Sequence, residues 1–292
     1  MSQNVSPPTP LYKYFPARRA SKFFENPVLR FTPPLDLNDI FELNPPILEL
    51  MSDEKLSCLR HFYDACQKNQ TVKSFVEIIE QFLKIYDSGG LNSSRNYIMS
   101  TLMEKIGMGI LSLSSEPDSL LMWAHYCEKD KGFAVELDTS KCFQSEPSEQ
   151  PFFFPPKKIE YVIDRPIISL LEIGKSDVNG ELLAKIENGE TELMRLFFKP
   201  VFFTKSMNWS YEEEWRVAAL PVDSLNTITN DKNLPIIGLT QLPVDAIKSV
   251  ILGARTEPEL QEQALNFSKK HNLTLKQAIP DTRKFSLNIE TI

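Results

Sequence analysis

The spacing of hydrophobic and polar residues changes along the chain, and these changes predict where strands give way to helices. LYKYF, residues 11–15, alternates between two faces, which is typical of a strand. Residues 17–24 fit a short helix that ends near Asn26-Pro27, and VLRF at 28–31 predicts a second strand. From 52 to 107 apolar residues recur about every 3.6 positions, so this stretch is predicted to be helical.

Strand patterns return after residue 107. The predicted elements are a strand at 108–114, a short helix at 119–127, a strand at 133–138 whose Phe, Val and Leu face inward, and a β-α-β ending at 249–253, 257–271 and 273–278. The proline-rich stretch 142–157 predicts a loop without regular structure. The predicted fold class is therefore α+β, with a mixed or antiparallel central sheet and an inserted helical subdomain at about 52–107.

The domain organisation follows from the same pattern. Residues 1–10 contain three prolines and no apolar period, so they are predicted to be a flexible N-terminal arm. Residues 11–292 are predicted to form a single domain that carries the helical insertion. The loop at 32–43, TPPLDLNDIFEL, holds several apolar residues, including Ile40 and Phe41, and is expected to pack down on the core.

Composition narrows the class of protein. A chain of 292 residues with 42% hydrophobic content can bury a large core. It has neither a spanning apolar run nor a signal-peptide pattern, so we expect no membrane association and a cytoplasmic location. The net charge of −7 argues against a broad nucleic-acid-binding surface. Cysteines 58, 66, 127 and 142 lack CxxC spacing and are expected to be buried free thiols rather than disulfides or zinc ligands.

The richest candidate chemistry lies at 202–220, FFTKSMNWSYEEEWRVAAL. If residues 210–217 form a strand, Glu212, Glu214 and Arg216 share one face, while Trp215 and Val217 point to the other. Two carboxylates about 7 Å apart on a strand can share a ligand or perturb one another's ionisation. The alternative is a solvated strand face with ordinary Glu-Arg pairing.

A second informative stretch is 109–138. Its strand ends in Ser112 and Ser114, and the following helix offers Trp123, His125 and Tyr126. Hydroxyls beside aromatic rings can form a wall for a planar ligand. The alternative is ordinary core packing, and we expect Trp123, Trp209 and Phe41 to pack in either case.

Five boxes in order carry a resemblance to a family. LYKYF, LNDIFEL, SLSS with LMWAHY, GFAVELD and KSMNWSYEEEWR, followed by VILGAR, together resemble a widespread, largely prokaryotic family of domains of unknown function. The resemblance spans residues 11 to about 255. One box departs from the family pattern, because Ile40 stands where a proline is expected, whereas Asn38, Asp39 and Glu42 match.

The order of these boxes is also remotely similar to that of the ADP-ribosyltransferase superfamily, where an early strand gives a polar or aromatic residue, a middle strand Ser or Tyr, and a late strand Glu-x-Glu. That resemblance implies NAD as a substrate, a protein or nucleic-acid acceptor, and a toxin or phage-defence effector that works with a partner protein from the same defence locus. Its implied catalytic pair is Glu214, facing the oxocarbenium-like charge, and Glu212, orienting the acceptor. The implied NAD-binding residues are Tyr12, Lys13, Ser112, Ser114, Trp123 and Tyr126.

Two rival hypotheses come from other classes. A Mg²⁺-dependent nuclease would use Asp138, Glu160, Glu212 and Glu214 as oxygen ligands, although Glu-x-Arg stands where such enzymes usually carry Glu-x-Lys. A non-catalytic module would use the acidic strand to recognise a basic partner. Neither GxGxxG nor GxxxxGK[ST] occurs, so the phosphate loops of other nucleotide-binding classes are absent from the sequence.

Overall fold

The computed structural model describes residues 10–42, 60, 80, 84, 109–143, 152–166, 202–220, 226–229 and 235–292. The chain divides into two compact units, the first comprising 1–31, 110–159 and 208–292, and the second 32–109 and 160–207. Nearly all of the predicted flexible arm and of the predicted helical insertion at 52–107 lies outside the described residues. Those two predictions, and the single domain they belong to, stay predictions.

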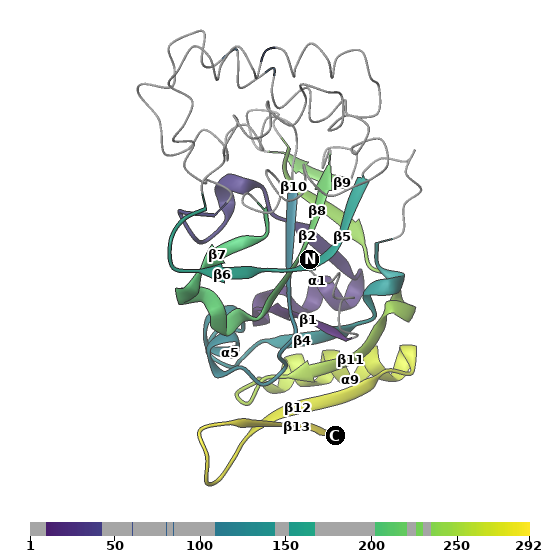
Figure 1. Ribbon diagram of the computed structural model, residues 1–292. Coiled ribbons are helices and arrows are strands. Elements are labelled where there is room, and N and C mark those ends of the chain that lie inside the picture. The colour runs from purple at the N-terminus through teal and green to yellow at the C-terminus, as the bar shows by residue number, and fades with distance from the viewer. Residues whose placement is uncertain are drawn as a thin grey trace. The chain divides into compact units, whose positions relative to one another are not determined.

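An eight-stranded mixed sheet organises the first unit (Figure 1). Its strand order is β13-β12-β11-β4-β1-β3-β8-β5. The strands are β1 Leu11–Phe15, β3 Gly109–Ser114, β4 Phe133–Leu137, β5 Phe152–Lys158, β8 Glu214–Leu220, β11 Ile247–Leu252, β12 Thr274–Pro280 and β13 Leu287–Thr291. Together with the helices described below, this sheet confirms the predicted α+β class.

The C-terminal part of the chain contains a parallel β-α-β motif, as the sequence predicts. Strands β11 and β12 pair in parallel and are joined by α9, Pro258–His271. Pro258 occupies the first turn, where its missing N–H costs no hydrogen bond, and Asn272 ends the helix in the left-handed region at φ 54°. Strand β13, which the sequence pattern does not predict, then pairs antiparallel with β12.

Two smaller sheets complete the described strands. In the first unit, β2 Val28–Phe31, β10 Pro235–Gln241 and β9 Asn226–Thr229 form an antiparallel sheet in the order β2-β10-β9. In the second unit, β6 Glu160–Val162 and β7 Thr204–Ser206 pair in parallel. The 3-10 helices are η1 Ala17–Arg19, η2 Pro34–Asp36, η5 Thr139–Lys141, η7 Met207–Glu212 and η9 Val244–Ala246.

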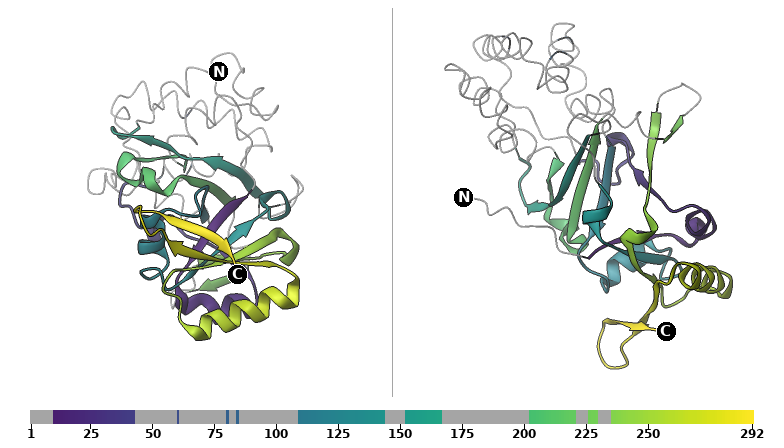
Figure 2. Two further views of the ribbon diagram at one scale, coloured as in Figure 1. Left: turned by 90° about the horizontal axis from the view of Figure 1, so that it is seen from below. Right: turned by 90° about the vertical axis from the view of Figure 1, so that its right-hand side faces the viewer.

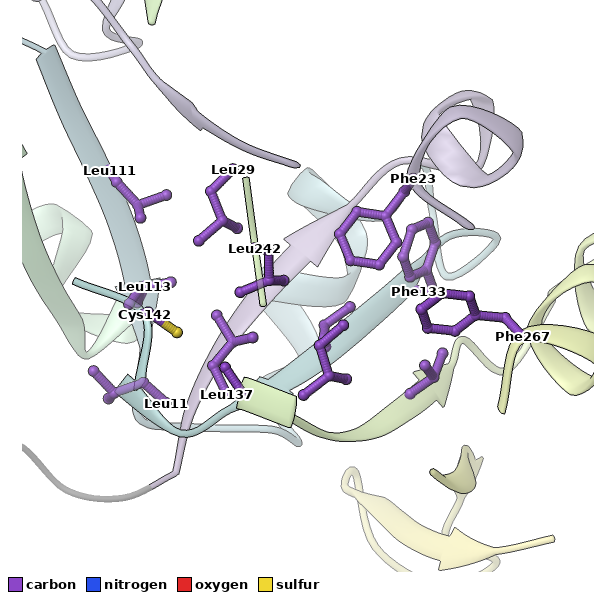
Figure 3. Packing of buried hydrophobic residues seen from close by; sticks show 14 of the residues in the cluster. Leu11, Phe23, Leu29, Leu111, Leu113, Phe133, Leu137, Cys142, Leu242 and Phe267 are labelled. Atoms are coloured by element: carbon purple, nitrogen blue, oxygen red, sulfur yellow. The ribbon is translucent and has the colours of Figure 1, made fainter. Parts of the chain in front are cut away.

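Helices cover both faces of the large sheet. Helix α1, Ala20–Glu25, and α9 lie side by side over one face, where Phe23, Phe133 and Phe267 form an aromatic cluster (Figures 2 and 3). Helix α5, Leu120–Tyr126, packs the buried rings of Trp123 and Tyr14 edge to face on the other side, with centroids 5.3 Å apart. Ser119 caps α5 by accepting a hydrogen bond from the Met122 N–H. We call these two sides the α9 face and the α5 face.

Strands β1 and β3 meet at a single residue pair, Tyr12 opposite Ser114. On its other edge β1 pairs with β4 along its full length, from Leu11 opposite Leu137 to Phe15 opposite Phe133. The large sheet therefore consists of two parts, β13-β12-β11-β4-β1 and β3-β8-β5, joined at one point.

The prediction that the proline-rich stretch 142–157 is an irregular loop is wrong for its C-terminal part, and residues 144–151 lie outside the described residues. Residues Phe152–Lys158 form β5, at the edge of the sheet. The pairing of β5 with β8 shifts register between Phe154 and Lys157, where Pro155 and Pro156 lie. Proline lacks the N–H that a central strand needs, but an edge strand with a bulge tolerates it, so tertiary position overrides local composition here.

The loop at 32–43 packs differently from expectation. Ile40 and Phe41 are 69% and 52% exposed, whereas Asp39 and Glu42 are buried. The prediction that Ile40 and Phe41 pack on the core is therefore wrong, because the turn directs Asp39 and Glu42 inward instead. Among the described residues, no helix combines the length and the apolar character needed to cross a bilayer.

Candidate functional site

A row of polar side chains crosses the α5 face of the large sheet. Ser114 on β3 lies opposite Tyr12 on β1, Tyr12 opposite Glu136 on β4, and Glu136 opposite Ser249 on β11. Residues directly opposite each other on paired strands point to the same face. Four strands thus present four polar side chains in line, in a sheet whose neighbouring positions are largely apolar.

Glu136 is the charged centre of this row. It is 9% exposed, and its Oε2 accepts hydrogen bonds from the Ser249 hydroxyl and from the Lys276 ammonium, the latter at 2.6 Å. Burial, together with the charges of Glu136, Glu116 and Asp118, raises the pKa of Tyr12 to about 12. The Tyr12 hydroxyl is therefore a protonated hydrogen-bond donor at neutral pH. The sequence signal for Glu136 was a single charge inside the otherwise apolar strand FAVEL.

Ser114 holds the end of η7 in place. Its fully buried hydroxyl donates to the Glu212 carbonyl at 2.7 Å and accepts from the Glu116 N–H at 3.1 Å. The neighbouring Ser115 N–H donates to the Glu213 carbonyl at 3.1 Å. A predicted ligand-binding serine thus positions the predicted catalytic segment.

Glu212 and Glu214 do not share a strand face, so that prediction is wrong. Glu212 ends the 3-10 helix η7, and β8 begins only at Glu214. Between them Glu213 takes a left-handed conformation with φ 42°, which breaks the alternation that a continuous strand would give. The Glu212 carboxylate is instead directed to α5, where Tyr126 donates its hydroxyl to Oε1.

Glu214 is held in a buried ion pair with Arg216. The guanidinium donates from Nε to Oε1 and from Nη2 to Oε2, each at 2.9 Å, and both residues are at most 1% exposed. The alternation along β8 is otherwise as predicted, because Trp215 and Val217 join the core on the α9 face. Such a fork-to-fork pair fixes the carboxylate in both position and charge.

Lys13 lies on β1 beside β3, and its ammonium interacts electrostatically with Glu214 and Glu212. Its ammonium donates to the Ser112 carbonyl at 2.8 Å, so Ser112 contributes its backbone rather than its hydroxyl to this contact. Burial lowers the pKa of Lys13 to about 8. The negative charge of Glu214 raises this pKa, the positive charge of Arg30 lowers it, and the charge of Glu212 raises it. The charges of Glu212 and Glu214 therefore both raise the pKa of Lys13 on β1, against the effect of burial.

The aromatic residues fall into two groups. Trp123 is fully buried, and its indole N–H donates to the Pro117 carbonyl at 2.8 Å, so we assign it to packing rather than to ligand stacking. Tyr126 is half-buried beside Glu212. The rings of His125 and Trp209 lie 6.0 and 6.1 Å from that of Tyr211, and all three reach the surface. Tyr211 was not among the residues predicted from sequence.

Two of the oxygen ligands named by the nuclease hypothesis have other partners in the structure. Asp138 follows β4 and accepts hydrogen bonds from Ser140, whereas Glu214 is paired with Arg216. Glu160 is an exposed residue of the second unit. In the described part of the chain, no group of three or more His, Cys, Asp or Glu side chains is arranged to hold a metal ion. Cys127 and Cys142 are buried free thiols, as predicted.

Comparison with known proteins gives one match. Residues 122–217 match the family described as Protein of unknown function (DUF2971). This stretch runs from α5 to β8 and includes Tyr126, Glu212, Glu214 and Arg216. It supports the predicted resemblance to an uncharacterised domain family over that part of the chain. Neither the curated proteins nor the solved structures contain a match to this chain.

Proposed function

We propose that this protein transfers ADP-ribose from NAD to a protein or nucleic-acid acceptor, with Glu212 as the carboxylate that stabilises the reacting ribose. The observation that carries the proposal is the order β1-β3-β8 in the sheet. It sets Tyr12 opposite Ser114, and Ser114 against Glu212. An aromatic residue, a serine and a Glu-x-Glu segment from an early, a middle and a late strand are what the resemblance to ADP-ribosyltransferases implies.

The chemistry requires one well-placed negative charge. The bond between C1′ of the ribose and the nicotinamide nitrogen breaks, and nicotinamide leaves with the bonding electron pair. The acceptor nucleophile then forms a bond to C1′ and gives up its proton to a base or to water. Positive charge develops on the ribose between these events, so a carboxylate aimed at it lowers the barrier.

Glu212 suits this role better than Glu214, which the sequence favoured. Both oxygens of Glu214 accept hydrogen bonds from a buried guanidinium, so its negative charge is already compensated. The Tyr126 hydroxyl donates to Oε1 of Glu212 and orients that carboxylate. We therefore assign Glu212 to catalysis and Glu214 to positioning.

The surrounding side chains fit the nicotinamide end of NAD. Tyr126 and Tyr211 offer partly exposed rings for stacking, and the protonated hydroxyl of Tyr12 is a donor on the same face of the sheet. An enzyme of this kind would serve as a toxin or phage-defence effector, alongside a partner protein from the same locus. The proposal that the acceptor is a protein or a nucleic acid rests on this biological role and not on residues of the site.

The decisive experiment measures nicotinamide release from NAD by the purified protein, with cell extract as the acceptor source and EDTA present. We expect release by the parent and a loss of about 100-fold or more in Glu212→Gln, the order found when one stabilising group is removed. Glu213→Gln is the matched control, because Glu213 is the next residue and forms a surface ion pair with Lys158 at 2.8 Å. It should stay within about twofold of the parent.

Two results would refute the proposal. One is equal activity in Glu212→Gln and the parent. The other is no turnover of NAD by the parent in any extract; cleavage of DNA or RNA that requires Mg²⁺ would then favour the nuclease, and retention of a basic partner without turnover would favour the binding module.

A further inference from the structure

A second polar site lies in the second unit, around Asp39. Asp39 and Glu42 follow η2, and Lys205 is the middle residue of β7. The Lys205 ammonium lies 3.1 Å from Glu42 Oε1, and both side chains are almost completely buried. This ion pair joins two segments that are far apart in the sequence.

A pocket of about 200 Å³ lies beside the ion pair. It is lined by Asp39, Phe41, Glu42, residues 162–166 and residues 204–206. The Arg165 guanidinium carbon lies 5.1 Å from the centroid of the Phe41 ring, which is half exposed. A cavity of about 150 Å³ is large enough for a benzene molecule, so this pocket has room for one ring or a short side chain.

Asp39 gives the pocket an unmet chemical requirement. The residue is 8% exposed, and its Oδ1 accepts a hydrogen bond from the Phe41 N–H at 2.9 Å. Its Oδ2 is buried and receives no hydrogen bond within the described part of the chain. A buried carboxylate oxygen without a donor is costly, so a ligand that supplies an N–H group would remove that cost.

We propose that this pocket binds the amino or guanidino group of a small organic cation, with Asp39 as its counter-ion. The lining contains three acidic residues, Asp39, Glu42 and Asp164, and two basic ones, Arg165 and Lys205, so it carries a formal charge of −1. Glu42 and Lys205 neutralise each other, which leaves Asp39 as the buried anion. The exposed ring of Phe41, already approached by one guanidinium, is a surface on which a second cation can rest.

The site is independent of the proposed ADP-ribosyl transfer, so it is tested by binding. The probes for calorimetry are n-butylguanidine and n-butylamine, with the neutral n-butylurea as a shape-matched comparison. We expect saturable binding of the two cations at about 1 mM or below, and binding of the urea at least about tenfold weaker. N-acetylarginine amide tests whether the pocket also binds the guanidino group of a protein arginine. Affinity equal to that of n-butylguanidine would identify protein arginines as the ligand, and weaker affinity would identify free small cations.

Three variants locate the binding. Asp39→Asn keeps the shape but removes the charge and should weaken n-butylguanidine at least about tenfold. Phe41→Leu changes an exposed side chain, so it should fold normally and weaken binding about two- to fivefold. Asp36→Asn, in the same segment but outside the pocket lining, should bind as the parent does. Equal binding of cation and urea, or undiminished binding in both Asp39→Asn and Phe41→Leu, would overturn the proposal.

Discussion

Removing the guanidinium from the buried Glu214–Arg216 pair should destabilise the first unit severely. In Arg216→Met, the Glu214 carboxylate loses two hydrogen bonds of 2.9 Å at a site that water does not reach. Breaking a buried ion pair by deleting one partner typically costs about 3–5 kcal/mol, because the remaining charge stays buried without compensation. Glu214→Gln should be destabilising for the same reason, since an amide N–H₂ group would then face the guanidinium.

The magnitude can be checked with two comparisons. Replacing both residues, as in Glu214→Leu with Arg216→Met, removes both charges and should cost less than either single change. Glu213→Gln breaks only the neighbouring exposed pair with Lys158, whose side chains are 38% and 50% exposed, and should cost under about 1 kcal/mol.

Urea unfolding followed by tryptophan fluorescence is a suitable assay. The three tryptophans of the chain, Trp123, Trp209 and Trp215, all belong to the first unit, so the signal reports on that unit. A midpoint for Arg216→Met equal to that of the parent would refute the reasoning. So would a double variant whose cost equals the sum of the two single ones, because the residues would then be acting independently.

Three further predictions follow from other parts of the first unit. Burial lowers the pKa of Lys13 from 10.5 to about 8, so between these pH values the unfolded chain binds more protons than the folded one. The contribution of Lys13 to the free energy of unfolding therefore rises as the pH rises from 8 to 10.5. Urea titrations of Lys13→Met over this pH range should lack that rise relative to the parent. Gly132→Ala should melt at a clearly lower temperature, with a cost of about 1–3 kcal/mol or more, because the new Cβ would lie 2.1 Å from the Phe15 carbonyl oxygen; an unchanged melting temperature would contradict this packing. Burial raises the pKa of the Cys127 and Cys142 thiols, so iodoacetamide at neutral pH should label neither in the native protein and both in urea, as peptide mass spectrometry would show.

Where a segment's pattern is local, the sequence predicts this fold well. The alternation of LYKYF gives β1, and residues 257–271 give α9. The α+β class and the parallel ending follow from the order of such segments. Each of these elements has a continuous period and clear ends, so local propensity and tertiary packing agree.

Where long-range pairing decides, the same reasoning fails. Composition cannot show that Phe152–Lys158 lies at a sheet edge, where its prolines are tolerated. Nothing in the run of three glutamates shows that Glu213 adopts a positive φ, so the sequence places Glu212 and Glu214 on one face although they belong to different elements. The row through Tyr12 and Glu136 depends on the register of separate strands, which no local pattern contains.

The sequence identified several residues that lie together in the candidate site, but it did not show which of them bind a ligand and which only pack in the core. Glu212, Ser114 and Tyr126 are joined by hydrogen bonds within one network, although they come from distant boxes. Trp123, by contrast, is a core residue. Residue type alone could not separate them, because a buried aromatic and a ligand-stacking one look the same until solvent exposure is known.

The position of β1 has a consequence for how the chain acquires its structure. This strand comes first in the sequence, yet it lies in the interior of the large sheet, and its two partners are β3, ending at Ser114, and β4, ending at Leu137. During synthesis LYKYF therefore has neither neighbour until the chain has been made as far as β3, which ends at Ser114. Contacts of such long sequence separation slow folding. A deletion or fusion that disturbs these five residues removes the middle of the sheet, not its margin. Until its partners have emerged, the unpaired strand offers its backbone N–H and C=O groups to another copy of the chain.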